Sequence, residues 1–211
     1  MRVTKFTHSC LRIEGEGVLV VDPGAFSEKS VLDGADAIVV THEHFDHLDV
    51  AAVNEAVSRR PQIRVFAHAD VLKLLEDVAD ATTPVLPGEG FTAAGFEISA
   101  YGGAHAVIHQ DIPRITNLAY LISDGSTNLY HPGDSFTVPE GAEVDTLFVP
   151  LNAPWMKTAE AIDFARAVKP GRAFALHDAL LNERGAAVSD KHLENLSGTR
   201  YRHVSPGTTL D

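Results

Sequence analysis

Cysteine is nearly absent from this 211-residue sequence, which contains Cys10 and no other. One cysteine cannot form an internal disulfide or a thiolate metal cluster, so a metal would have to be held by histidine, aspartate or glutamate. The sequence also lacks any run of about 18 apolar residues, and its first residues contain no apolar segment typical of an export signal. We therefore expect no membrane span and a cytoplasmic location.

Positive charge is scarce as well. The chain has 17 lysines and arginines against 29 aspartates and glutamates, a formal net charge of −12. Nucleic-acid binding normally depends on a basic face, so this balance argues against a nucleic-acid partner and favours a small-molecule substrate. The charge balance does not exclude a homo-oligomer. The length fits a single domain covering residues 1–211.

Histidines and carboxylates are concentrated in one short stretch, Thr41–His47, directly after an apolar run. Neutral imidazoles and carboxylates all donate electron pairs, so gathering them is costly unless a cation lies among them. His42 and His44 project the same way from extended chain and can share one cation. Asp46 and His47 come after the chain begins to turn and point elsewhere. The stretch therefore predicts two adjacent metal ions.

Strand-like and helix-like segments follow one another along the chain. Strands are expected at 2–7, at 10–21 with a hairpin at 14–17, at 37–40, 62–67 and 172–176, and in several short runs between 82 and 149. Helices are expected at 49–58, with Asp49 as N-cap, and at 69–78, 158–168 and 186–197. This order indicates two β-rich halves with helices outside.

The spacing H-x-H-x-D-H after an apolar strand resembles the signature of the metallo-β-lactamase fold. Further elements of that pattern are present at later strand ends: Val20–Gly24 with Asp22, Gly102–His105, His131–Ser135 with Asp134, and Phe174–His177. The resemblance implies an α/β fold, an αββα sandwich of two packed mixed β-sheets with helices on the outer faces. The short chain and its Pro-Gly-Asp element resemble the small branch that includes L-ascorbate-6-phosphate lactonase-like hydrolases.

The resemblance also implies a ligand set. It assigns one metal to His42, His44 and His105, the other to Asp46, His47 and His177, and Asp134 to both. His109 is an alternative to His105; we favour His105, which stands at the glycine-led strand end, and interpret His109 as a pocket residue. Asp22 would orient a ligand histidine. His8 and Trp155 are candidate pocket residues.

The function implied is that of a dinuclear metal-dependent hydrolase. A hydroxide bridging two metal ions would cleave an ester, lactone or phosphodiester bond of a small molecule, with Asp46 as the catalytic residue that orients the nucleophile or accepts its proton. Zinc is the expected metal, although manganese, iron and nickel also suit histidine and aspartate ligands. Two alternatives stay open: a nuclease or phosphodiesterase acting on nucleic acid, and a non-hydrolytic metal-binding protein of the same fold.

Overall fold

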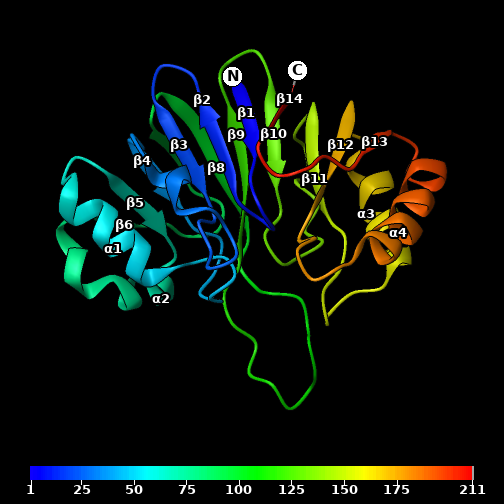
Figure 1. Cartoon of the computed structure of the whole chain (residues 1–211), viewed down its shortest axis with the longest axis horizontal. Helices are drawn as coiled ribbons and strands as arrows, with labels where there is room; N and C mark the ends of the chain where they lie inside the picture. Colours follow the sequence, from blue (N-terminus) through cyan, green and yellow to red (C-terminus); the bar gives the residue numbers. More distant parts are fainter. Residues whose placement is uncertain (211) are drawn as a thin grey trace.

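Two seven-stranded β-sheets face each other in the computed structural model of this protein, which describes residues 1–210 (Figure 1). In the first sheet the strand order is β14 (Thr208–Leu210), β1 (Arg2–Lys5), β2 (Leu11–Glu14), β3 (Val18–Val21), β4 (Ala37–Val39), β5 (Arg64–Ala67) and β6 (Thr82–Pro84). In the second it is β13 (Arg200–Arg202), β12 (Arg172–Leu176), β11 (Thr146–Pro150), β10 (Asn128–His131), β9 (Leu118–Ser123), β8 (Phe96–Gly102) and β7 (Gly90–Ala93).

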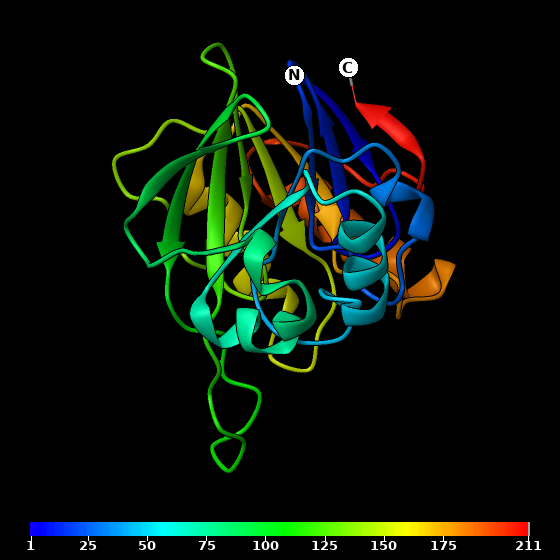
Figure 2. The same cartoon turned by 90° about the vertical axis from the view of Figure 1, so that its left-hand side faces the viewer.

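Helices cover the outer face of each sheet, as the two views show (Figures 1 and 2). The first sheet carries η1 (Lys29–Leu32), α1 (Val50–Arg59), α2 (Ala69–Leu72) and η2 (Lys73–Ala81); the second carries α3 (Thr158–Val168) and α4 (Glu183–Leu196). This αββα arrangement confirms the predicted fold class. Within residues 1–210 no helix combines the length and apolar character needed to cross a membrane.

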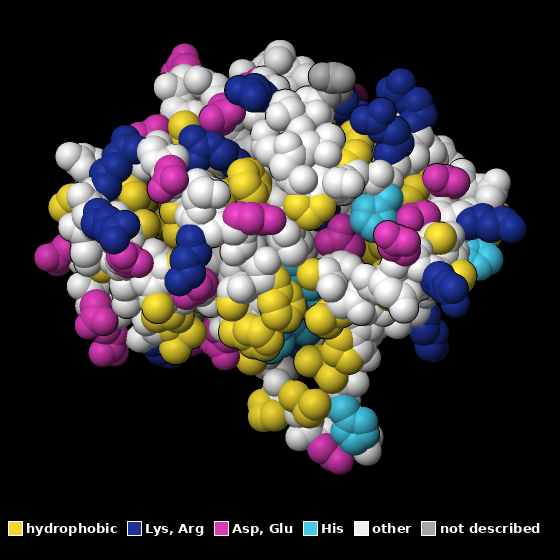
Figure 3. Space-filling model, viewed as in Figure 1, with side chains coloured by type: hydrophobic (Ala, Val, Ile, Leu, Met, Phe, Trp, Pro, Cys, Tyr) yellow, Lys and Arg dark blue, Asp and Glu magenta, His cyan; other side chains and the backbone are white. Residues whose placement is uncertain are grey.

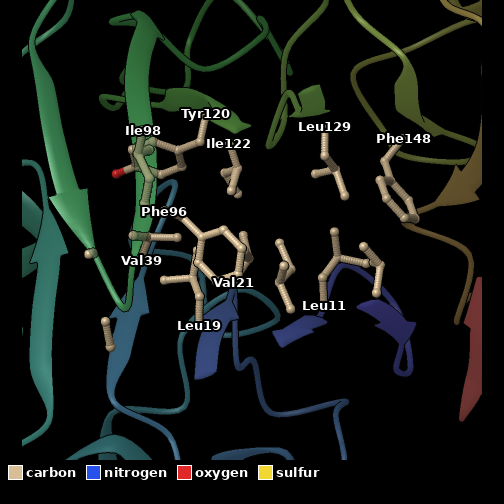
Figure 4. Close-up of a cluster of buried hydrophobic side chains, with 14 of the residues drawn as sticks. Leu11, Leu19, Val21, Val39, Phe96, Ile98, Tyr120, Ile122, Leu129 and Phe148 are labelled. Carbon is tan, nitrogen blue, oxygen red and sulfur yellow. The ribbon is translucent and has the colours of Figure 1, made fainter. Parts of the chain in front are cut away.

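The main core lies between the two sheets (Figure 4). Strand side chains alternate between faces, so Leu19 and Val21 of β3 point inward towards Phe96 and Tyr120 of the second sheet. The intervening residue, Val20, packs outward in the core beneath α1. Alternation therefore explains why the continuous apolar run of β3 is buried on both faces.

Strand direction places the loops that carry histidines and carboxylates. In the first sheet β1, β3 and β4 run the same way, and in the second β8, β10, β11 and β12 do so. Segments that follow parallel strands emerge at the same edge of a sheet. Each sheet thus delivers its polar loops to one edge of the sandwich.

Two predicted helices differ from the structure. The expected helix at 69–78 is a single turn, α2, continued by η2, in which Leu75 and Val78 leave helical geometry. The apolar residues here are three apart, a spacing that suits tighter i to i+3 turns, and burying them determines the backbone. The last helix begins at Glu183, before the predicted 186, because Asn182 caps it by accepting from Gly185 N–H at 2.9 Å.

A buried ion pair joins the two sheets near this edge. Lys5, at the end of β1, is fully buried, and its ammonium group donates to the Asp178 carboxylate at 2.9 and 3.1 Å. Asp178 follows β12. His203 contacts the same carboxylate at 2.9 Å through Nε2 and contacts Asp190 of α4 through Nδ1 at 2.9 Å. The end of β12 is therefore anchored to both β1 and α4.

Candidate metal centre

The candidate ligands and the two residues that orient them, Asp22 and His8, come from segments that follow six different strands. His8 follows β1, Asp22 directly follows β3, residues 41–47 follow β4, His105 lies beyond β8, Asp134 beyond β10, and His177 directly after β12. His177, Asp22 and His8 adopt left-handed backbone conformations, with φ of 55°, 47° and 66°. Such conformations are unfavourable for residues other than glycine and are often found at functional sites.

Metal-ligating atoms gather in two clusters. Within each cluster the atoms lie within 4.8 Å of one another: one contains His42, His44, His105 and Asp134, and the other His8, Asp46, His47 and His177. The structure thus brings together all the residues proposed as ligands from the sequence, and it adds His8 to the second cluster.

Asp134 lies between the two clusters. Its Oδ2 atom is 3.3 Å from Nε2 of His105 and 3.2 Å from Nε2 of His177, and Oδ1 is 3.1 Å from Nε2 of His47. The carboxylate is 3% exposed. This position suits the bridging role proposed for Asp134, since it touches histidines of both clusters.

Hydrogen bonds fix how three of the imidazoles face the centre. Nδ1 of His47 lies 2.7 Å from Asp22 Oδ2, Nδ1 of His105 lies 2.6 Å from the Ala106 carbonyl, and Nδ1 of His177 lies 2.6 Å from the Asn152 carbonyl. These oxygens only accept hydrogen bonds, so each Nδ1 carries the proton and donates. The Nε2 atoms are consequently turned inward with their lone pairs available.

The inward-facing atoms have no hydrogen-bond partner in the part of the chain that the structure describes. Nε2 of His47, His105 and His177 and Oδ1 of Asp134 are all buried and unsatisfied. An unsatisfied buried polar group costs about 1–3 kcal/mol, and here several converge on the same space. A divalent cation accepts electron pairs from all of them at once, so these residues fit two bound metal ions.

Asp22 orients a second histidine through Thr41. The Thr41 hydroxyl donates to Asp22 Oδ2 at 2.7 Å, and the Thr41 backbone N–H donates to Oδ1 at 2.8 Å. Because the hydroxyl proton is committed to the carboxylate, Thr41 Oγ1 accepts from His42 Nδ1, 2.9 Å away. The fully buried Asp22 therefore supports both His42 and His47. The sequence predicted the role of Asp22 but not that of Thr41.

His8 contacts Asp46 as a hydrogen-bond donor. Nδ1 of His8 accepts from the Ala179 backbone N–H at 3.3 Å, which leaves the proton on Nε2. Nε2 lies 3.2 Å from Asp46 Oδ2 and donates to it. The His8 ring is fully buried and packs 4.0 Å, centroid to centroid, from the His177 ring. Although His8 is close enough to join the second cluster, this tautomer assigns it the role of orienting Asp46.

Trp155 forms a hydrogen bond to the central carboxylate. Its indole N–H donates to Asp134 Oδ2 at 2.8 Å, and its ring packs edge-on against the rings of His105 and His177. The sequence placed Trp155 in a pocket wall and gave no sign of this bond.

Burial and charge shift the pKa values of the clustered groups in opposite directions. Burial disfavours the ionised form of Asp46, but the hydrogen bond from His8 and the nearby His47 and His177 outweigh it and bring the pKa of Asp46 to about 2. Burial lowers the pKa of His42 well below its ordinary value. For His47 burial acts the same way, yet Asp134 and Asp22 raise its pKa well above the ordinary value. A bound metal ion would take the place of that proton.

Two of the histidines outside the clusters, His109 and His131, lie close to candidate ligands in the sequence. His109 is 59% exposed on the loop between β8 and β9 and belongs to neither cluster, so its interpretation as a pocket residue stays a prediction. This loop extends beyond the rest of the molecule in both cartoon views (Figures 1 and 2). His131 is buried but donates from Nε2 to the Ser9 carbonyl at 2.8 Å, and Nδ1 accepts from Gly133 N–H. Both of its nitrogens are therefore occupied.

With this fold and this centre, the chain belongs to the β-lactamase superfamily domain family, whose model matches residues 2–177. It is 37% identical to Protein Rv0786c of Mycobacterium tuberculosis over 96% of this chain and 95% of that protein. It is 26% identical to a UPF0173 metal-dependent hydrolase of Aeropyrum pernix over 71% of this chain and 67% of that one. Among solved structures, the metallo hydrolase Igni18 of Ignicoccus hospitalis shares the fold, with a TM-score of 0.76, 18% identity and coverage of 99% and 97%.

Proposed function

We propose that this metal-dependent hydrolase cleaves an ester, lactone or phosphodiester bond of a small molecule at the paired clusters. The observation that carries the proposal is the set of buried, unsatisfied Nε2 and carboxylate atoms, which converge from both sheets on space that two cations would fill. The two clusters would hold two divalent cations, zinc being the metal we favour, and the cations would supply a water molecule of lowered pKa and polarisation of the bond to be broken.

Asp46 is the residue to which we assign proton handling. His8 holds its Oδ2 atom, whereas Oδ1 forms no hydrogen bond within residues 1–210. The Asp46 side chain is 15% exposed, whereas the Asp134 side chain is 4% exposed, so Asp46 is the more accessible of the two carboxylates. One oxygen held by donors and one left open suit a carboxylate that binds a cation and also accepts a proton from the attacking water. The low pKa of Asp46 keeps it ionised at neutral pH, as binding a cation and accepting a hydrogen bond from the attacking water require.

The walls around the centre favour a small molecule with an apolar part. A small hollow beside His44 and His105 is bounded by Val107 and Ile112, which are 59% and 49% exposed, and by Arg114. The space-filling view shows hydrophobic side chains on both sides of the exposed histidine surface (Figure 3). Arg114 donates from Nε to the His105 carbonyl and forms no ion pair within residues 1–210. Its remaining donors suit a carboxylate or phosphate on the substrate.

The test combines a substrate panel with one variant. Lactones, phosphodiesters, thioesters and β-lactams are offered to metal-loaded protein, and we expect turnover of at least one class. Asp46→Asn should then lower kcat by about 10²–10⁴-fold, the range for loss of a general base, while the protein stays folded. Asp111→Asn, the same change on the exposed loop, serves as the control and should leave kcat unchanged.

Two results would contradict the proposal. Full turnover by Asp46→Asn would remove the assigned role of this carboxylate. A fully metal-loaded protein without turnover on any class would favour the non-hydrolytic alternative, and cleavage of RNA or DNA alone would favour the nuclease. The net charge of −12 counts against the nuclease, because a nucleic-acid substrate would be repelled.

A further inference from the structure

Three arginines surround a hollow on β12 and β13 that lies outside both metal-binding clusters. The hollow, about 280 Å³ in volume, is lined by Arg172 and Phe174 of β12 and by Arg200 and Arg202 of β13. Arg172 begins β12 and His177 follows its end, so about 16 Å of strand separates these two residues, whereas about 10 Å separates Phe174, opposite Arg202, from His177, at about 3.3 Å per residue. Figure 3 shows lysine and arginine side chains gathered over the upper ends of these strands.

The strand register forces the three guanidinium groups together. β12 and β13 are parallel, with Arg172 opposite Arg200 and Phe174 opposite Arg202. The guanidinium groups of Arg172 and Arg202 each lie 5.5 Å from the centre of the Phe174 ring. Like charges placed opposite each other on neighbouring strands are destabilising, so this register carries an electrostatic cost.

Nothing in the described part of the chain neutralises these charges. Arg172, Arg200 and Arg202 form no ion pair with any carboxylate of residues 1–210, although the chain has 29 acidic residues. By contrast, Arg12 and Arg60 each pair with one. Protection of an exposed sheet edge explains charged residues on β13, the edge strand, but not Arg172, which is half-buried on the strand inside it.

Two of the side chains are oriented by hydrogen bonds through their Nε atoms. Arg172 Nε donates to Thr146 Oγ1 at 2.9 Å, and Arg200 Nε donates to the Gly171 carbonyl at 3.3 Å. These bonds leave the terminal nitrogens of both guanidinium groups available. Such planar, paired donors match the oxygens of phosphate groups.

We propose that the hollow between β12 and β13 binds a small molecule bearing linked phosphate groups, at a site separate from the metal centre. Three guanidinium groups offer more charge and more donors than one phosphate needs, so a ligand with two adjoining phosphates satisfies them best. The ligand would remove the like-charge repulsion that the strand register imposes. This site does not depend on the proposed hydrolytic function.

Inorganic pyrophosphate is the probe for the test, used with zinc-loaded protein at constant ionic strength. Amide and Arg Nε–H signals are followed by two-dimensional NMR, because pyrophosphate can also reach the metal centre and the positions of the shifting signals separate the two sites. We expect saturable shifts in β12 and β13. Arg200→Gln/Arg202→Gln should weaken this binding at least tenfold, and both side chains are exposed, so folding should be kept.

The matched control is Arg59→Gln/Arg184→Gln, which removes the same charge from two other exposed positions. Unspecific attraction of pyrophosphate to the protein depends on net charge and is screened by salt, so it would fall equally in both double variants. An equal loss of pyrophosphate affinity in the two double variants would overturn the proposal. Shifts confined to residues around the metal ligands, or no saturable shift in β12 and β13, would overturn it as well.

Discussion

At the scale of single residues, the centre depends on where each imidazole carries its proton. His47, His105 and His177 all donate from Nδ1 to an oxygen, and this directs Nε2 inward. His8 has the reverse arrangement, because a backbone N–H already occupies its Nδ1. The same residue type therefore has two roles here, and the neighbouring acceptor or donor decides which.

This difference predicts how a His8 variant behaves. His8→Phe removes the donor to Asp46 but keeps a ring to pack against Phe26 and His177. The protein should still bind two metal ions, with affinity for one of them reduced about 10–100-fold, as is usual when a group that orients a ligand is lost. Chelator competition followed by metal analysis measures both quantities. A stoichiometry of one metal would instead make His8 a ligand, and exposed His109→Phe should change neither value.

At the scale of elements, the loop after β4 depends on its contact with the loop after β3. Gly24 allows the closest approach: a Cβ atom at this position would lie 1.8 Å from the Asp46 carbonyl oxygen and 2.6 Å from the His47 nitrogen. Both contacts involve backbone atoms, so no side-chain rotation can relieve them. The position of two candidate ligands is therefore set by the absence of a side chain on a neighbouring loop.

Gly24→Ala should consequently move the Asp46–His47 backbone. We expect unfolding free energy to fall by about 1–3 kcal/mol, the usual range for overpacking, and metal affinity to fall with it. Urea unfolding and metal titration measure the two effects. Gly90→Ala is the control, because its nearest neighbour would be 3.9 Å away. Unchanged metal affinity in Gly24→Ala would show that this contact does not position the ligands.

The same scale shows what could be predicted from the sequence. Strand β4 and the polar loop after it were predictable because residues 36–47 combine a buried apolar run with ligand types at fixed spacing. The fold class was predictable for a related reason, since this pattern recurs at other strand ends. The backbone of residues 69–78 was not predictable, because a three-residue apolar spacing suits either α or 3-10 turns and only packing decides between them.

Contacts made through the backbone were beyond prediction. The carbonyl groups of Ala106 and Asn152, which orient His105 and His177, have no signature in the sequence because every residue carries a carbonyl. His109 was assigned to the pocket from its proximity to His105 along the chain. Loop geometry leaves its side chain exposed, and residue spacing does not encode that exposure.

At the scale of the whole molecule, the contacts of His203 link β12 to α4 and introduce a dependence on pH. Hydrogen bonding to Asp178, and then to Asp190, raises the pKa of His203 above its ordinary value of 6.5, against the opposing effect of burial. The protonated form is therefore stabilised by folding. This stabilisation is fully present below pH 6.5 and is lost as the pH rises through the higher pKa of the folded protein.

His203→Gln should accordingly destabilise the protein most under acidic conditions. We expect a loss of about 1–2 kcal/mol in unfolding free energy near pH 5.5, the size of partly exposed charged hydrogen bonds, and a smaller loss near pH 8.5. Urea unfolding of wild type and variant at both pH values measures this difference. His192→Gln, at an exposed position of α4, should show no such trend. A loss of unfolding free energy that grows as the pH rises would contradict the assigned stabilisation of protonated His203.

The bond from Trp155 to Asp134 gives the molecule an optical property of its own. Trp155 is the one tryptophan in the chain, so all indole fluorescence comes from a ring hydrogen-bonded to the central carboxylate and packed against His105 and His177. Cation binding changes the charge on these same neighbours. Occupancy of the centre can thus be followed by emission from the unmodified protein, without a substrate and without a label.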